Sequence, residues 1–573
     1  MFPRHAVLYC TNSRTACRKT RTGAKLPSPA ALEAATVVPR RAWSIDNFAV
    51  NEANHPQLTT PATDRPAQSH AVAPKDAAAV ILLRAGTDPR DPQVFWARRS
   101  ERMAFLGGFY AFPGGQRDAA DAETTVENCD DAETRAMISC AARELFEELG
   151  VLVARGAETL TKGQLASLLD DLTSGRMSFP ALLAHYRLHL DARDFTFAGR
   201  WVTPPFSPRR FDTWFFLVNC PRKQAARVLS IEFDCGEWIS ACAAAARWQN
   251  YEALVAPPAL HALQVLTGGI TDNLVERFLS VPQAHRQPVR RIEFVPGFIC
   301  FPVRTPTKPP ATHTNCYLVG EREFIIIDPA SIHEEEQAAL ASCVDELIAE
   351  GRAPREIILT HHHPDHVGGV EALREHLGGN IPIAAHELTA EMLKEKVRVD
   401  RFIADGDLIE LAGAPPLTLR ALHTPGHTRG HLSFYEERTG VLITGDNIVG
   451  LGSVLIDPPE GDMRDYLQAL ECYRSLLPRV SVLLGGHGPA IGSPRAKIEQ
   501  YIAHRLEREA NILAAVRAGV GSPAEIVAQV YTDMPPKAHV MAERAVLAHL
   551  EKLTADQLIV RESVGRYVAR EGA

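Results

Sequence analysis

The stretch Thr360-His361-His362-His363-Pro364-Asp365-His366 follows directly after a short apolar run at residues 357–359. The apolar run predicts a β-strand, and in an extended backbone His361 and His363 point their imidazoles to the same side. Asp365 and His366 follow on the turn into the next segment, where they can face a second ion. Nitrogen and oxygen donors gathered at the end of a strand are typical of sites for divalent metal ions such as zinc.

Three further blocks extend this pattern downstream. They are Thr424-Pro425-Gly426-His427, Thr444-Gly445-Asp446 and Gly485-Gly486-His487-Gly488. A single His-X-His pair could equally be an idle, solvent-facing turn. The recurrence of donor residues, mostly at the ends of apolar runs, favours a site for two ions instead.

This set of motifs resembles that of the metallo-β-lactamase superfamily. The resemblance implies an αββα sandwich, two bound zinc ions and hydrolysis of a bond that the metal ligands alone do not specify. It implies as ligands of the first ion His361, His363 and His427, as ligands of the second Asp365, His366 and His487, and as the bridge between them Asp446. Asp365 is also the catalytic candidate of this site. Asp328, after the apolar run 324–327, would orient the ligand loop, whereas His362 would not bind metal.

Composition limits the class of protein. The chain has 573 residues, which suggests several domains, and its 46% hydrophobic and 23% charged residues are ordinary for globular proteins. It has no apolar run long enough to span a membrane, so we expect no membrane association. A net charge of −8 argues against a broadly basic coat for nucleic acid. Eleven cysteines without a Cys-X-X-Cys pair fit reduced thiols, and we expect a cytoplasmic protein.

Residues 1–75 are basic, poor in acids and without apolar periodicity, and they end in a proline-containing stretch. We predict a disordered basic tail and linker here. An organelle transit peptide is the alternative.

A second pattern begins at residue 76. Residues 77–83 and 94–99 predict a β-hairpin, followed by Phe112-Pro113-Gly114-Gly115 and by Arg143-Glu144-Leu145-Phe146-Glu147-Glu148-Leu149-Gly150. The second block lies on a predicted helix that Asp130 or Asp131 could cap. Its three glutamates are spaced i, i+3 and i+4, so they share one face and repel each other unless a cation neutralises them. Oxygen ligands suit Mg²⁺ or Mn²⁺, and a solvated acidic helix face is the alternative.

Together with the predicted strand 209–216, these blocks resemble the Nudix hydrolase family over residues 76–270. The resemblance implies an α/β/α sandwich, Glu144, Glu147 and Glu148 as catalytic metal ligands, and Arg143 as their ion-pair partner. Gly115 and Arg143 are 28 positions apart, twice the family's usual spacing. The family's upstream glutamate position therefore falls on Asp121 or on Arg135, depending on the end from which it is counted. The sequence around residues 100–121 is similar to the acyl-CoA diphosphatase branch, which implies a nucleotide or coenzyme A derivative as substrate.

The C-terminal part predicts helices over 496–516, from Ser522 and over 541–553, followed by a hairpin hinged at Gly565. This order indicates a winged-helix module, with a packing or dimerisation appendage as the alternative. Following the metal motifs, it resembles the β-lactamase-like endoribonuclease group. That resemblance implies single-stranded RNA as one substrate. The candidate phosphate contacts, which could equally be solvated surface, are Arg505, Arg508, Arg561 and Arg566.

We therefore predict a multidomain α/β and α+β protein. Its parts are the tail 1–75, a Nudix domain 76–270, a metallo-β-lactamase domain 291–495 and a winged-helix domain 496–573. The predicted function is bifunctional metal-dependent hydrolysis, of phosphodiesters or esters at the zinc site and of nucleoside diphosphate-linked compounds at the Nudix site. The alternative is a glyoxalase-II-like thioesterase whose Nudix domain is a non-catalytic nucleotide sensor. The sequence does not specify the oligomeric state.

Overall fold

The computed structural model describes residues 72–570 except 87, 89, 104, 533–537 and 564. Of the tail predicted over residues 1–75, residues 1–71 lie outside the described residues. Among the described helices, none combines the length and the apolar composition that crossing a membrane requires.

The first domain is built on one mixed sheet. Its strands are β1 (Lys75–Arg84), β2 (Gln93–Arg99), β3 (Tyr110–Ala111), β4 (Gly114–Gln116), β7 (Thr196–Val202), β8 (Phe211–Asn219) and β9 (Phe233–Ser240). β1 lies at the centre, antiparallel to β2 and parallel to β8. The predicted hairpin is present, because β1 pairs with β2 in antiparallel fashion, with Leu83 opposite Val94 and Arg84 opposite Gln93. A separate pair joins β5 (Val126–Glu127) to β6 (Leu190–Asp191).

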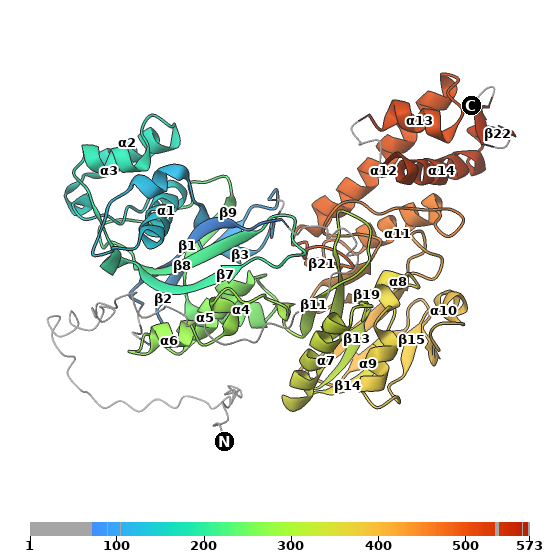
Figure 1. Cartoon of the computed structure of the whole chain (residues 1–573), viewed down its shortest axis with the longest axis horizontal. Helices are drawn as coiled ribbons and strands as arrows, with labels where there is room; N and C mark the ends of the chain where they lie inside the picture. The colour runs from blue at the N-terminus through green and yellow to red at the C-terminus, as the bar shows by residue number, and fades with distance from the viewer. Residues whose placement is uncertain are drawn as a thin grey trace, which may run out of the picture. The chain divides into compact units, whose positions relative to one another are not determined.

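Helices cover both faces of this sheet (Figure 1). They are α1 (Ala132–Leu149), α2 (Lys162–Thr173), α3 (Phe179–His185), α4 (Ala241–Gln249), α5 (Pro257–Thr267) and α6 (Leu274–Phe278). Successive residues of β1 alternate between the faces. Val80 and Leu82 pack in the core that contains α1, whereas Ile81 and Leu83 pack in the core that contains α4 and α5. The described elements therefore make an α/β/α sandwich, as predicted.

The second domain has two sheets packed face to face. The first contains β10 (Ile292–Val295), β11 (Phe298–Arg304), β12 (His313–Val319), β13 (Glu323–Ile327), β14 (Ala353–Ile358), β15 (Ile383–Ala385) and β16 (Arg401–Phe402). The second contains β17 (Leu408–Leu411), β18 (Leu417–His423), β19 (Leu432–Glu436), β20 (Val441–Gly445) and β21 (Val482–Gly485). Their inner faces share a buried core that includes Ile325 and Ile358 from one sheet and Phe434 and Leu484 from the other.

Helices cover the outer faces of both sheets. The helices on the first sheet and its connections are α7 (Glu334–Ala349), α8 (Pro364–Val367), α9 (Val370–His376) and α10 (Glu387–Leu393), and on the second α11 (Met463–Ser475). Figure 1 shows α7 and α9 beside β13 and β14. This arrangement is the αββα sandwich that the sequence predicted.

The C-terminal part contains three helices and a hairpin among its described residues. They are α12 (Pro494–Arg517), α13 (Pro523–Val530), α14 (His539–Ala555), β22 (Ile559–Ser563) and β23 (Arg566–Ala569). Ser522 caps α13 in a capping box with Glu525, as the sequence suggested. The three helices share a core with Ile559 and Tyr567 of the hairpin, which is a helical module carrying a two-stranded wing.

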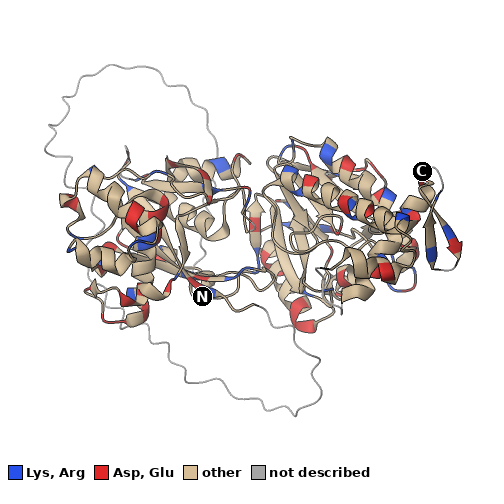
Figure 2. Ribbon diagram, turned by 90° about the horizontal axis from the view of Figure 1, so that it is seen from above, with Lys and Arg blue, Asp and Glu red and all other residues tan. Residues whose placement is uncertain are grey.

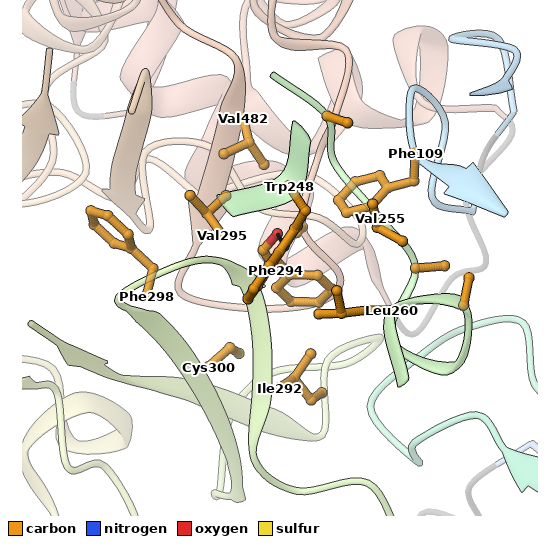
Figure 3. Close-up of a cluster of buried hydrophobic side chains, with 14 of the residues drawn as sticks. Phe109, Trp248, Val255, Leu260, Ile292, Phe294, Val295, Phe298, Cys300 and Val482 are labelled. Atoms are coloured by element: carbon orange, nitrogen blue, oxygen red, sulfur yellow. Dashed lines mark hydrogen bonds between the residues drawn. The ribbon is translucent and has the colours of Figure 1, made fainter. Parts of the chain in front are cut away.

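The cores of the first and second domains are continuous (Figure 3). Trp248 of α4 packs beside Phe294 of β10, and its indole Nε1 donates a hydrogen bond to the Phe294 carbonyl oxygen (3.2 Å). Phe109 meets Phe294 edge to face, with ring centroids 5.8 Å apart. Because this junction is buried and apolar, the two domains are packed as one body rather than joined by a linker alone.

Candidate metal centres

The histidine-rich stretch leaves the carboxyl end of β14 in the middle of its sheet. β14 is parallel to both β13 and β15, so residues 357–359 are fully buried. His361 follows beyond the carboxyl end of this interior strand. His363 is the N-cap residue of the short helix α8, whose first residue is Pro364. Proline at this position favours the start of a helix. The turn places Asp365 and His366 on α8, as the sequence indicated.

One donor group is formed by His361, His363 and His427, whose ligand atoms lie within 4.8 Å of one another. Nδ1 of His363 lies 3.1 Å from Nε2 of His361 and 3.0 Å from Nε2 of His427. His427 comes from the loop after β18, more than sixty residues downstream. The fold therefore brings together the three histidines predicted for one ion.

A second donor group is formed by Asp365, His366 and His487. Nε2 of His487 lies 3.7 Å from a carboxylate oxygen of Asp365. Asp446 lies between the groups: one of its oxygens is 3.4 Å from His366, and the other is 3.2 Å from His487 and 3.8 Å from His427. This is the position that a bridging ligand would take.

The second nitrogens of the rings are held by neighbouring polar groups. Nδ1 of His366 faces Asp328 at 2.8 Å, and Asp328 also accepts hydrogen bonds from the backbone and hydroxyl of Thr360 (2.8 and 2.6 Å). Nδ1 of His487 donates to the His313 carbonyl oxygen (2.8 Å), and Nδ1 of His427 donates to the carbonyl oxygen of residue 455 (3.0 Å). Such contacts fix the ring orientation and direct the other nitrogen toward a metal.

Burial keeps three of the imidazoles neutral. It lowers the pKa of His361 well below the ordinary value, and together with the neighbouring His427 it lowers the pKa of His363 to about 2. Burial also lowers the pKa of His427. A neutral imidazole offers a free lone pair, which is the form that binds zinc.

Asp446 and the two histidines beside it shift one another's pKa, and Asp446 outweighs burial to raise the pKa of His487 above its ordinary value. Burial opposes the ionisation of Asp446, but His487 and His366 hold its pKa well below the usual range. Burial likewise opposes protonation of His366, but Asp446 and Asp328 outweigh it and raise the pKa of His366 well above the ordinary value.

Two observations fit this donor set to metal ions. Nε2 of His366 and the nearby oxygen Oδ1 of Asp446 are buried, and neither forms a hydrogen bond within the described residues. Unsatisfied buried polar atoms of this kind indicate a ligand. At Gly486 a Cβ atom would lie 2.3 Å from that Asp446 oxygen, so glycine leaves the carboxylate its space. The nitrogen and carboxylate donors suit two zinc ions.

The structure adds residues that the sequence analysis did not single out as part of the site. His431 is fully buried, and its Nε2 accepts a hydrogen bond from the backbone N–H of Asp446 (3.2 Å). The side-chain amide of Asn315 donates to the carbonyl oxygens of Gly485 and Gly488 (both 2.9 Å) and so holds the loop that carries His487. The available signal was the run of polar residues His313-Thr314-Asn315 ahead of the apolar part of β12. His362 lies outside the donor groups, with Nδ1 3.9 Å from Glu460.

The predicted carboxylate helix of the first domain is α1, which Asp131 caps through the Thr134 N–H and Gly150 ends in the left-handed conformation. Arg143 on this helix pairs with the fully buried Asp121 through two hydrogen bonds (3.0 and 2.9 Å). Arg135 instead lies in the first turns of α1 and donates to the carbonyl oxygen of residue 130 (2.6 Å). Of the two alternatives for the upstream acid, the structure therefore pairs Asp121 with Arg143.

The three glutamates lie around that pair. Arg143 also bonds Glu144 (2.8 Å) and Glu147 (3.1 Å), while Glu148 accepts from the Gly114 N–H (2.7 Å). Burial raises the pKa of Glu144 to about 7, raises the pKa of Glu147 and, with Glu144, raises the pKa of Glu148 well above its usual value. Among described residues, the groups whose donor atoms come within 4.8 Å of one another are those of the second domain, not these glutamates. The donor atoms of the glutamate cluster are therefore farther apart than those of the second domain, and they are all carboxylate oxygens.

Two known protein families match the second and third parts of the chain. Residues 309–487 match the metallo-beta-lactamase superfamily, and residues 522–566 match the beta-lactamase associated winged helix domain. Both resemblances predicted from the sequence are thereby confirmed, whereas the endoribonuclease group within the superfamily stays a prediction.

Two relatives and one solved structure illustrate the likeness. A "Beta-lactamase-like protein 2 homolog" of Caenorhabditis elegans is 28% identical over 249 residues, which are 43% of this chain and 80% of the relative. An "Atrochrysone carboxyl ACP thioesterase" of Aspergillus chevalieri is 31% identical over 269 residues, 44% of this chain and 79% of the relative. A crystal structure of a NUDIX hydrolase from Alicyclobacillus acidocaldarius aligns with 36% of this chain and 96% of its own, at 32% identity and a TM-score of 0.32. The Nudix interpretation of the first domain stays a prediction.

The fold agrees with these comparisons. The thioesterase is similar over most of its own length, and the superfamily match includes the His–Asp cluster, which consists of His361, His363, Asp365, His366, His427, Asp446 and His487. The chain belongs to the metallo-beta-lactamase superfamily and is a metal-dependent hydrolase with the beta-lactamase associated winged helix domain at its C-terminal part.

Proposed function

We propose that the second domain hydrolyses thioesters with two zinc ions held by the His–Asp cluster. The observation that carries the proposal is the convergence of two donor groups on either side of Asp446. A bound pair of zinc ions lowers the pKa of water and polarises the bond to be cleaved. The ligands would be the seven residues predicted from the motifs.

The chain's own residues would handle the proton. We assign the role of proton acceptor to Asp365, whose side chain is partly exposed and lies beside His487. The hydroxyl of Thr314 donates to the backbone carbonyl oxygen of Asp365 (2.7 Å) and so holds that turn in place. His431 and Asp328 would keep Asp446 and His366 oriented through the reaction.

Two features support a thioester rather than RNA. The relative named as a thioesterase is 31% identical over most of its own length. In addition, two of the four arginines predicted as phosphate contacts are used inside the protein. Arg505 is 4% exposed and donates to the carbonyl oxygen of residue 454 (2.5 Å), and Arg508 donates to that of residue 530 (2.7 Å).

The charge distribution points the same way. Figure 2 shows Lys and Arg interspersed with Asp and Glu along the described ribbon. Near the metal cluster, Arg429 lies 4.0 Å from the acidic Glu460. A continuous stripe of Lys and Arg side chains would bind a polyanion such as RNA more strongly.

The test is hydrolysis of a panel of substrates by the purified full-length protein: an acyl-CoA, lactoylglutathione and a single-stranded RNA. We expect thioester cleavage in the wild type, none in Asp446→Ala, and normal cleavage in Glu147→Gln, which alters only the first domain. Metal analysis should find close to two zinc ions in the wild type and fewer in Asp446→Ala. Cleavage of RNA without thioester cleavage would refute the substrate class and favour the endoribonuclease resemblance.

We further propose that the first domain cleaves nucleoside diphosphate-linked compounds with Mg²⁺ or Mn²⁺. The buried Arg143–Asp121 pair carries this proposal, because it orients Glu144 and Glu147 on the helix face predicted to bind the metal. A coenzyme A derivative would connect the two activities, since its thioesters are substrates of the kind proposed for the second domain.

Glu147→Gln tests the first site. It keeps the shape of the side chain and removes one charge, and a lost charge-assisted contact is worth about 1.5–3 kcal/mol. We expect Mg²⁺-dependent cleavage of coenzyme A or ADP-ribose to fall about ten- to a hundredfold, while His363→Ala leaves it unchanged. If the wild type binds these compounds without cleaving them, the alternative of a nucleotide sensor holds instead.

A further inference from the structure

The loop that carries His487 is bounded on both sides by the first domain. On one side, His487 donates a hydrogen bond to the backbone carbonyl oxygen of His313, at the start of β12. Downstream in sequence, the same loop continues to Gly492, just before α12. His313 and Gly492 each contact a segment of the first domain.

The first contact is made by Phe206 in the loop between β7 and β8. Phe206 is 7% exposed, and its ring lies against the ring of His313, with centroids 6.4 Å apart and an angle of 61° between the planes. It also belongs to the apolar core that runs through both domains. An aromatic side chain at the tip of a surface loop is usually solvated, so its burial against the second domain is a specific contact.

The loop holds Phe206 rigidly. Three of its residues are proline, at positions 204, 205 and 208, which restricts the backbone. Its neck is closed by hydrogen bonds from Arg210 to the Thr203 carbonyl oxygen (3.0 Å) and from the Phe211 N–H to the Thr203 hydroxyl (3.1 Å). Phe206 is therefore presented in one position.

The second contact is a close approach of two backbones. At Gly492 a Cβ atom would lie 2.5 Å from the Gly107 carbonyl oxygen and 3.0 Å from the Phe109 ring. At Gly108 a Cβ atom would lie 2.4 Å from the Gly492 carbonyl oxygen, and Gly108 has φ +84°. The chain between Gly107 and Phe109 leads directly into β3 and then to Gly114, which bonds Glu148.

We propose that the first domain positions His487 in the metal centre of the second domain, with Phe206 as the positioning residue and the Gly108–Gly492 contact as its second support. Phe206 acts through His313, whose carbonyl oxygen orients the imidazole of His487. Phe206 is not a catalytic residue. The proposal makes the metal centre a product of both domains, so that the segments around the first site also set the geometry of the second.

The experiment measures zinc affinity in full-length variants by competition with a chelator, together with the absorption spectrum of the Co²⁺-substituted protein. Loss of a group that orients a metal ligand from outside typically lowers affinity by about 10- to 100-fold. For Phe206→Ala, which acts one residue further out, we expect about a tenfold loss for one of the two ions and a changed Co²⁺ spectrum. Phe206→Tyr keeps the aromatic ring, so we expect it to have the zinc affinity and the Co²⁺ spectrum of the wild type.

The matched control is Phe179→Ala. Phe179 is 1% exposed and lies in the core on the other side of the first domain's sheet. It should destabilise the first domain without changing zinc affinity. Gly492→Ala provides a second variant if Phe206→Ala does not fold, and it should also weaken one ion.

Wild-type affinity for both ions in Phe206→Ala and Gly492→Ala would overturn the proposal. An equal loss of zinc in Phe179→Ala would also overturn it, because the effect would then reflect general destabilisation. The proposal rests on the metal centre proposed above. A wild-type protein that binds no zinc would refute that centre, whereas two ions bound equally by wild type and variants would refute only the positioning role.

Discussion

Replacing Asp121 by asparagine removes the charge that neutralises a buried arginine. The Asp121 side chain is 1% exposed and that of Arg143 is 8% exposed, and two hydrogen bonds join them. Asparagine fills the same volume but offers one oxygen and no charge. Removing one partner of a buried ion pair costs about 3–5 kcal/mol because the other charge stays buried. Since Arg143 keeps Glu144 and Glu147 as partners, we expect about 3 kcal/mol, the lower end of this range.

Tryptophan fluorescence can follow this loss in the first domain. Five of the six tryptophans lie between residues 96 and 248, the sixth is Trp43, and none follows. In urea, the emission change therefore reports unfolding of the first domain within the full-length chain. With a urea dependence of about 1–3 kcal/mol per molar, Asp121→Asn should lower the midpoint by about 1–3 M.

Two further variants decide whether the ion pair is the cause. Glu123→Gln changes an exposed acid in the short 3-10 helix η3 (Ala119–Glu123), which also holds Asp121, and should alter stability by less than about 0.5 kcal/mol. Replacing both partners, as in Asp121→Leu with Arg143→Met, should recover part of the lost stability, because neither charge of this pair is then buried alone. The recovery should be incomplete, since Glu144 and Glu147 lose Arg143 as a partner. A wild-type urea midpoint for Asp121→Asn would refute the reasoning.

Two other predictions concern the metal sites. Gly486→Ala would place a Cβ atom 2.3 Å from Asp446 and 2.8 Å from His366, so we expect the purified variant to contain fewer than two zinc ions; Gly163→Ala, where no atom lies within 4 Å, should contain the normal number. In protein freed of divalent cations, the pKa of Glu144 is raised, chiefly by burial, from 4.5 to about 7. A group whose pKa is higher in the folded state than in the unfolded state stabilises the fold at pH values below its unfolded pKa. The free energy of unfolding of the first domain should therefore fall as the pH rises from about 4.5 to about 7. Tryptophan-monitored urea unfolding should show this slope in the wild type and a smaller one in Glu144→Gln, and equal slopes would contradict the assignment.

Local sequence was sufficient wherever a property depended on spacing within one segment. His361 and His363 follow an apolar strand, so their common direction results from the extended backbone, and α8 begins at Pro364 as the turn predicts. The cap at Asp131 and the end at Gly150 likewise follow from the chain next to α1. These local patterns were also the ones that identified the superfamily and the winged helix.

Contacts between distant segments required the tertiary structure. Counting along the chain could not choose between Asp121 and Arg135, because the choice depends on which side chain the fold brings to Arg143. Arg505 looked like a phosphate contact by its charge, yet it packs inward against Tyr466 and a backbone carbonyl. Phe206 gave no signal in the sequence, since its role depends on where the second domain lies. A buried charge or aromatic ring needs a partner, but sequence spacing does not say which partner, because the packing of sheets and domains determines which side chains meet.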